Sequence, residues 1–571
     1  MCNAMQHGGP DDEGVFVNGT AGVALGHRRL SIIDLSSNGH QPMTDTAKKA
    51  WITFNGEIYN YRQLKKELLA LGAPFYSETD TEVILQAYLH WGTAAFAKLR
   101  GMFAFALYDI AGHATYLVRD TTGIKPLYYT TEGGKLMFAS EVKAFKAAGV
   151  ANTTDERWPV WLLSFGHIPE PFTTINGVLC LPKGHYLQWD SNGTYIVNSY
   201  ANNITGNTID KADIAKEGIY SHLLESVNRQ LISDAPIGVF LSGGIDSSIL
   251  TLLANAAKKQ QLKTISIYFE EKAYDERPYQ DAITSTVTGE CYKHLVKQQD
   301  FETHLPQIIE SMDVPTTDGI NTWFISKYAH DAGLKAVLSG IGADELFGGY
   351  PSFSRMAYLN YLHKLPSALL SAAQLFSNDG YKRFVYLQHP TPAADYLFLR
   401  GLFTPADIAQ VMNMDESQVN SILFNTLTFP RLESYDKLHA AWFETNIYMQ
   451  NQLLRDTDVM SMSHGLEVRV PFLDEDFQAY VSRIKPSIRF DSGRPKKLLI
   501  DSFNAILPQT VWKRPKMGFS FPLQSWMGNS PAITDQGRYK NGASKKIIGK
   551  FKNGQLHWSR AFALYQIQGH V

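Results

Sequence analysis

Little in this sequence ties the chain to a membrane, to nucleic acid or to a disulfide framework. Of its 571 residues only three are cysteines, Cys2, Cys180 and Cys291, and their spacing fits no metal-ligand pattern. Lys plus Arg number 53 against 55 Asp plus Glu, so a net charge of −2 gives no overall attraction to nucleic acid or anionic lipid. There is no apolar run long enough to span a bilayer and no signal-peptide core. We therefore expect a soluble, reduced, cytoplasmic protein without a nucleic-acid or membrane partner.

The pattern of the chain changes near residue 200, and the length exceeds what one hydrophobic core serves. Before that point, short β-rich runs and turn residues dominate, which predicts an α+β domain of sheets covered by helices over residues 1–200. After a polar segment at 202–208, strands alternate with helices, which predicts an α/β domain with a mostly parallel sheet over 201–530. Residues 531–571 are basic and rich in Gly and Asn, and we expect a packed tail without chemistry.

The most informative stretch follows the apolar run 236–241 and reads Ser242-Gly-Gly-Ile-Asp-Ser-Ser248 before an apolar helix. Gly243 and Gly244 let backbone N–H groups point into one concave pocket, and the helix adds the positive end of its dipole. A carboxylate at Asp246, beside bound phosphates, suits a ligand of Mg²⁺. A plain Gly-Ser turn with Asp246 near a helix N-terminus remains the alternative. There is no Walker A lysine, and the pattern resembles the pyrophosphate loop of the N-type ATP pyrophosphatases.

A second polar strand end supports the same chemistry. The run Val337-Leu-Ser-Gly-Ile-Gly-Ala-Asp-Glu345 places Ser339 and Gly340 after a predicted strand and Asp344 at the start of the next helix. In one parallel sheet these residues approach the first loop, because ligands bind at the carboxyl ends of the strands. Asp246 and Asp344 then form a candidate Mg²⁺ pair, although two acidic residues at a helix start can also be plain caps.

Several polar clusters in the first 200 residues are harder to explain as structure alone. They are Arg28-Arg29 inside a strand, Asn55-Gly56-Glu57 at a strand end, Asp80 at a helix start, and residues 119–129. Taken singly, each can be a capped turn or a surface pair, and Asp80 can be merely an N-cap.

Together these clusters resemble the class II glutamine amidotransferase domain of glutamine-dependent asparagine synthetases, an αββα fold. The residues that carry the resemblance are 9–14, 27–34, 55–60, 79–80, 100–105 and 138–142. The resemblance implies that Arg29 holds the glutamine α-carboxylate, Asp80 its α-amino group, and Asn55 with the Gly56 N–H the oxyanion. Leu30 and Glu57 complete the glutamine site that the resemblance implies.

The nucleophile is the weak point of the resemblance. The family uses an N-terminal cysteine that begins a Cys-Gly-Ile strand, whereas this chain starts Met1-Cys2-Asn-Ala and reaches Gly-Pro-Asp almost at once. Cys2 therefore resembles a residue of the helix before that motif, in a chain that lacks its first strand at the N-terminus. Gly8 also stands where the family has arginine. If the chain is complete in this form, we expect free ammonia alone to serve, and Cys2 to be an ordinary helical cysteine.

The second domain resembles the asparagine synthetase domain over nearly its whole length. Further matching residues are 313–318, 453–458, 467–474 and 514–519, together with Lys496, which would stabilise phosphate charge. The resemblance also implies an ATP site of Leu241, Ser242, Gly243, Gly244, Asp246, Ser247, Ile267, Ser339 and Gly340. Ile341 departs from the pattern, because some relatives have an acidic residue there that is thought to help the second half-reaction.

The resemblance therefore implies a ligase that uses ATP and Mg²⁺. It would convert aspartate to β-aspartyl-AMP and pyrophosphate, and ammonia, taken from glutamine or from solution, would then release asparagine and AMP. A homodimer is possible. Two alternatives stay open: a related amide- or lactam-forming ligase with another carboxylate, and a relative without catalysis.

Overall fold

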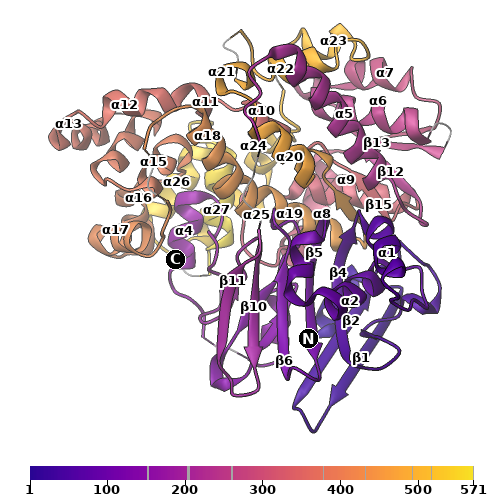
Figure 1. The fold of residues 1–571 in the computed structure, drawn as a ribbon. Helices are drawn as coiled ribbons and strands as arrows, with labels where there is room; N and C mark the ends of the chain where they lie inside the picture. The colour runs from indigo at the N-terminus through magenta and orange to yellow at the C-terminus, as the bar shows by residue number, and fades with distance from the viewer. Residues whose placement is uncertain are drawn as a thin grey trace.

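In the computed structural model an N-terminal domain of antiparallel sheets packs against a larger, helix-rich C-terminal domain (Figure 1). The structure describes residues 1–571 except 151–152, 202–205, 259–260, 377–378, 431–432, 491–492, 516 and 570–571. Part of the predicted linker 202–208 and Lys516 of the motif 514–519 therefore lie outside the described residues.

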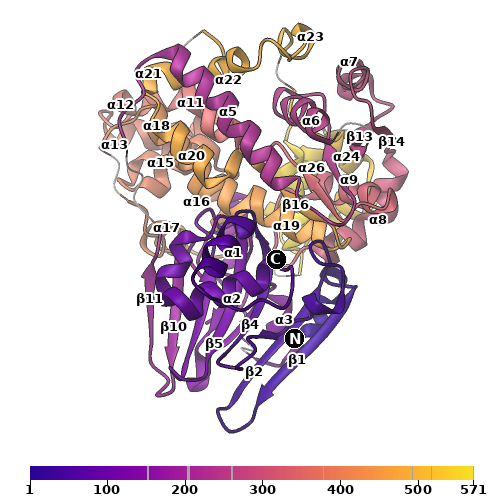
Figure 2. The ribbon, with the colours of Figure 1, turned by 45° about the vertical axis from the view of Figure 1, so that its right-hand side comes forward.

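A six-stranded antiparallel sheet is the main element of the N-terminal domain. In spatial order its strands are β11 (Tyr195–Ser199), β10 (His185–Asp190), β6 (Ala114–Arg119), β5 (Gly101–Asp109), β4 (Ala50–Ile58) and β3 (Met43–Thr44). The central strand β5 is apolar almost throughout because both of its faces are covered. Helices α1 (Tyr61–Ala70) and α2 (Asp80–Trp91) lie over the sheet (Figure 2). Thr79, not Asp80, is the N-cap of α2, so Asp80 is not needed for capping.

The second layer of this domain consists of two smaller sheets. One is the hairpin of β1 (Asp12–Asn18) and β2 (Val23–Arg29), and the other has β7 (Tyr128–Thr130) between β8 (Met137–Ala139) and β9 (Leu179–Cys180). Leu25, Leu117, Leu127 and Leu181 belong to one buried cluster that joins these layers. The stacked layers under α1 and α2 confirm the predicted α+β architecture.

The C-terminal domain is built on a five-stranded parallel sheet, as predicted. Its order is β14 (Glu290–Leu295), β13 (Lys263–Tyr268), β12 (Ile237–Phe240), β15 (Ala336–Leu338) and β16 (Glu467–Arg469). Sequence analysis missed β16, which has three residues and precedes Pro471. Val239 pairs with Leu338, and Leu338 with Arg469, so β12, β15 and β16 bring their carboxyl ends to one edge.

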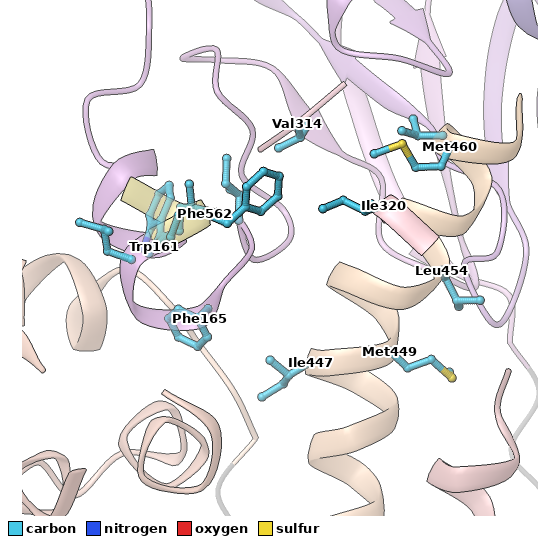
Figure 3. Close-up of a cluster of buried hydrophobic side chains, with 14 of the residues drawn as sticks. Trp161, Phe165, Val314, Ile320, Ile447, Met449, Leu454, Met460 and Phe562 are labelled. Carbon is cyan, nitrogen blue, oxygen red and sulfur yellow. The ribbon is translucent and has the colours of Figure 1, made fainter. Parts of the chain in front are cut away.

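Helices cover both faces of this parallel sheet. Two on one face are α5 (Ala212–Gln230) and α6 (Ile245–Lys258), and two on the other are α8 (Gln298–Ser311) and α9 (Ile320–Asp331). Three further helices extend the core on the face covered by α8 and α9. They are α15 (Pro392–Arg400), η10 (Glu444–Leu454) and α19 (Arg455–Met462). Figure 3 labels Val314, Ile320, Leu454 and Met460 among the buried side chains of this core. Among the described residues, no helix combines the length and apolar character needed to cross a bilayer.

The C-terminal segment is part of this core and not an appended tail. It forms the helices α26 (Gly542–Lys552) and α27 (Trp558–Gln566), with Phe562 and Ile567 fully buried. The Gln566 side chain donates to the Thr316 carbonyl over 2.6 Å and accepts from the Thr316 N–H. These contacts fix the loop that leads into α9.

A buried ionic cluster joins the two domains. The Arg469 guanidinium, 0 % exposed, lies 3.0 Å from Glu57 of β4 and 2.9 Å from Glu467 of its own strand. Beside it, the Lys125 ammonium lies 3.0 Å from Asp458 of α19. An unpaired charge is costly in such a setting, so each domain supplies the counter-charge for the other.

We expect Arg469→Met to lower the free energy of unfolding by about 3–5 kcal/mol, because it leaves Glu57 buried without its cation and Glu467 with only the Lys125 ammonium, 3.8 Å away. Urea unfolding followed by tryptophan fluorescence measures the change. The exposed Arg355→Met is the matched control. The double variant Arg469→Met/Glu57→Gln should recover part of the loss. Equal stabilities of the two single variants would contradict a structural role for the cluster.

Candidate functional site

The loop between β12 and α6 has the geometry of a cradle. Gly243 has a φ of 81°, which a residue with a side chain rarely adopts. The Ser242 and Ser247 hydroxyls lie 3.0 Å apart, and the Gly244 N–H donates to the Ser242 hydroxyl over 3.3 Å. Ser247 stands in the first turn of α6, so the loop and the helix N-terminus face the same space.

The second loop closes on the first where β15 ends. A Cβ on Gly340 would lie 2.8 Å from the Cβ of Asp246 and 3.2 Å from the Ser247 nitrogen, so only glycine fits. The Ser339 N–H donates to the Arg469 carbonyl over 2.8 Å, which ties this loop to β16. The two motifs thus form one site, although Asp246 and Ser339 are 93 residues apart in the sequence.

Lys496 lies between the two predicted metal ligands. Its ammonium is 2.6 Å from Asp246 Oδ2 and 2.5 Å from Asp344 Oδ1, and the residue is 5 % exposed. These two carboxylates raise the pKa of Lys496 above its ordinary value, against the opposing effect of burial. The described residues contain no cluster of three or more His, Cys, Asp or Glu suited to a metal. The protein therefore offers two converging carboxylates, and further ligands would come from phosphate or water.

These groups open into a cavity of about 730 Å³, which we call the large cavity. Its wall includes the predicted residues Ser242, Gly244, Asp246, Ser247, Ser339, Gly340, Asp344 and Lys496. Leu241 and Ile267 are buried in the cores on either side of the sheet instead, and Gly243 contributes its carbonyl to Arg514 over 3.0 Å.

Six predicted residues of the N-terminal domain line a second, small cavity of about 70 Å³. They are Arg29, Leu30, Asn55, Gly56, Glu57 and Asp80. Gly56 has a φ of 137°, and a Cβ there would lie 2.0 Å from the Met102 carbonyl oxygen, so glycine is required at this strand end.

The charged groups of the small cavity are held by backbone. The Arg29 guanidinium donates to the carbonyls of Ser36 and Asp34 over 3.0 Å and 2.6 Å. Asp80 accepts from the Ile58 N–H over 2.9 Å. Burial raises the pKa of Asp80 to about 7, while that of Glu57 rises well above its usual value despite the nearby Arg469.

Cys2 lies next to the small cavity but does not line it. It belongs to the 3₁₀ helix η1 (Cys2–Gly8) before Gly-Pro-Asp, and its sulfur lies against the backbone of Gly26. It lines a cavity of about 540 Å³, which we call the edge cavity, between β2 and β8. Asn55 lines both cavities, so Cys2 and the predicted oxyanion donor border the same edge cavity.

Sequence analysis missed several residues around these cavities. His557, Trp558 and Ser559 of the C-terminal segment line the large cavity, as do Asp318, Arg400 and Tyr448. Asp318 and Arg469 lie inside the motifs 313–318 and 467–474, which resemble the family. The resemblance indicated that these segments matter but assigned no role to either residue. Helix α19 contributes Asp456 and Thr457 to the large cavity and Asp458 and Met462 to the edge cavity.

This architecture defines a class of protein, in which an amidotransferase-type layered domain precedes an ATP-pyrophosphatase-type α/β domain. Two family models match accordingly: "Glutamine amidotransferase domain" over residues 1–201 and "Asparagine synthase" over residues 218–537. The chain belongs to the asparagine synthase family.

Curated relatives agree with this assignment. "Asparagine synthetase [glutamine-hydrolyzing] 1" of Bacillus subtilis (strain 168) is 33% identical over 538 residues, covering 93% of this chain and 84% of the relative. "Asparagine synthetase [glutamine-hydrolyzing] 3" of the same organism is 31% identical, covering 90% and 82%. "Amidase chry2" of Gibberella zeae is 28% identical, covering 91% and 84%.

We expect Gly340→Ala to lower ATP-dependent pyrophosphate exchange by about 100-fold, because the new methyl group displaces Asp246 and the phosphate loop. Gly528→Ala is the matched control, since a Cβ there meets nothing within 4 Å. Exchange at the wild-type rate in Gly340→Ala would show that the two loops do not act together.

Proposed function

We propose that this protein is an asparagine synthetase that couples ATP cleavage to amide formation. Aspartate and ATP give β-aspartyl-AMP and pyrophosphate in the large cavity. Ammonia then attacks the acyl carbon, which releases asparagine and AMP. The nitrogen comes from glutamine, bound in the small cavity, or from free ammonia. Adenylation replaces a poor leaving group by a good one, and the protein supplies position and charge neutralisation.

One observation carries the proposal: Lys496 bridges Asp246 and Asp344 beside the phosphate loop. A cation held at this point can neutralise the charge that develops when the α-phosphate is attacked. The N–H groups of the loop and of the α6 N-terminus add donors for the pyrophosphate.

In this proposal Mg²⁺ binds beside the same two loops. It prefers oxygen ligands and is commonly held by one or two carboxylates together with phosphate oxygens and water. Asp246 and Asp344 are the carboxylates available on the loops. When bound, the ion would polarise the phosphates for attack. The proposal also keeps the cytoplasm as the location and a homodimer as the assembly.

In the glutamine half, Arg29 would bind the α-carboxylate, Asp80 the α-ammonium, and Asn55 with the Gly56 N–H the developing oxyanion. Cys2 is the candidate nucleophile. Its α-amine becomes free as a base only when Met1 has been removed.

The decisive experiment measures pyrophosphate and asparagine from ATP, Mg²⁺ and aspartate, with glutamine or ammonium as nitrogen source. We expect asparagine with ammonium, and loss of pyrophosphate formation by at least about 100-fold in Lys496→Met, because the bridging charge is removed. The exposed Lys66→Met is a control. EDTA should abolish both products. Asparagine from glutamine as well would show that Cys2 works, and pyrophosphate only with another carboxylate would identify a related ligase instead.

Asp80 gives a pH-dependent prediction. Glutamine's ammonium pairs with the ionised carboxylate, so its dissociation constant should fall as the pH rises through about 7. Asp80→Asn should weaken binding at pH 8 by at least about tenfold and remove the pH dependence. Isothermal titration calorimetry measures binding without turnover.

The Asp80→Asn variant is expected to fold. The folded-state pKa of Asp80 is raised, so the stability it contributes is present below its unfolded pKa and is lost as the pH rises through about 7. The amide that replaces the Asp80 carboxyl group does not ionise, so the variant does not lose stability as the pH rises. Asp190→Asn, at the C-terminal end of β10, is the control. A pH dependence that persists in Asp80→Asn would refute the role of this carboxylate.

A further inference from the structure

The amide-forming step requires a proton acceptor. When ammonia attacks an acyl-adenylate, the new C–N bond leaves a positive charge on nitrogen, and a proton must leave before the amide is stable. Ile341 has no carboxylate to offer at the position where some relatives have one. A carboxylate that accepts this proton would therefore come from elsewhere in the cavity wall.

Five carboxyl groups line the large cavity: Asp246, Asp318, Asp344, Glu345 and Asp456. Asp246 and Asp344 are engaged by Lys496. Glu345 accepts from the Tyr350 hydroxyl over 2.8 Å, and Asp456 accepts from the Thr316 hydroxyl over 2.6 Å.

Asp318 is the carboxylate of the five to which no described side chain donates. Within the described part of the chain, the donor to its carboxylate is the N–H of the adjacent Gly319, which contacts Oδ1 over 2.8 Å. The other oxygen, Oδ2, receives no hydrogen bond from a described residue, and Asp318 lines the large cavity. This carboxylate is thus held in place through one oxygen while the other is available to a substrate.

Its position in the fold is the second argument. Asp318 precedes α9, and at Gly319 the chain lies against α19, where a Cβ would be 2.9 Å from the Met460 methyl carbon and 3.6 Å from the Asp456 Cβ. Helix α19 lines the edge cavity on its other side with Val459 and Met462. Asp318 therefore lies in the wall of the large cavity beside the helix that also lines the edge cavity of the N-terminal domain.

We infer that Asp318 is the general base of amide formation, taking a proton from the attacking nitrogen onto Oδ2. The assignment rests on the proposed function. The C–N bond forms with the nitrogen lone pair, the N–H proton passes to Asp318, and the acyl C–O bond to the phosphate breaks so that AMP leaves with its electron pair. The proton then passes to solvent.

The charges facing Asp318 are compatible with this role. Burial raises the pKa of its carboxyl group above the ordinary value, and the Arg400 guanidinium on α15 acts in the opposite direction. Asp456 on α19 and the Tyr448 hydroxyl on η10 are the other titratable groups that face it. A raised pKa makes the ionised carboxylate a stronger base.

The test separates the two half-reactions in the full chain. The first is measured as aspartate-dependent exchange between ATP and pyrophosphate without a nitrogen source, and the second as asparagine formed with ammonium. We expect Asp318→Asn to keep exchange within about twofold and to lose amide formation by about 100-fold or more. Expressed per free ammonia, so that the protonation of ammonia itself is removed, the wild-type rate of amide formation should fall on the acid side below the pKa of Asp318, and the variant should lose this limb.

Two comparisons keep the assignment falsifiable. Asp318→Glu should recover part of the activity, whereas Asp331→Asn, exposed at the other end of α9, should leave both half-reactions unchanged. Equal loss of both half-reactions, or a raised KM for aspartate in exchange with normal amide formation, would make Asp318 a substrate-binding residue and overturn the assignment. Amide formation at the wild-type rate in Asp318→Asn would also reject it. A wild-type chain without aspartate-dependent exchange would instead reject the proposed function itself.

Discussion

The structure depends on one buried cation, the guanidinium of Arg469, which lies between carboxylates of both domains. Glu57 comes from the strand end that lines the small cavity, and the Arg469 carbonyl receives the Ser339 N–H of the large cavity. A displacement of this residue would therefore be felt in both sites. Because a buried charge without its partner is so costly, the two domains have few ways to sit against each other.

The ion pairs of Arg469 therefore hold the cavities of the two domains at a fixed distance from each other. A nitrogen donor site in the N-terminal domain and an adenylation site in the C-terminal domain need to be close, because an acyl-adenylate is open to hydrolysis while it waits. Helix α19 contributes to the walls of both the edge cavity and the large cavity. One helical segment, α19 with η10 before it, thus contributes side chains to both cavities. Some of its residues line the large cavity and others line the edge cavity.

The contiguous motifs were predictable, because their residues act as neighbours along the chain. Ser242 to Ser247 form the turn after β12 and the first turn of α6, a local geometry that glycine and the helix N-terminus determine. Asp344 followed from the rule that parallel strands bring their carboxyl ends to one edge. The position of Cys2 in a helix before Gly-Pro-Asp could also be predicted, whereas the expectation that it is an ordinary helical cysteine stays a prediction.

The sequence by itself determined the two-domain order, the class of each sheet and the loops that approach phosphate, since periodicity and glycine placement act over short distances. Only the tertiary structure decided which charges meet. Arg469 and Glu57, Lys496 and Asp246, and Gln566 and Thr316 are each separated by hundreds of residues, and nothing local specifies such pairs. It also decided that Asp318, inside a motif without an assigned role, keeps one carboxylate oxygen available in the cavity wall. Burial and long-range contact are properties of the folded chain, because they depend on where every other segment lies.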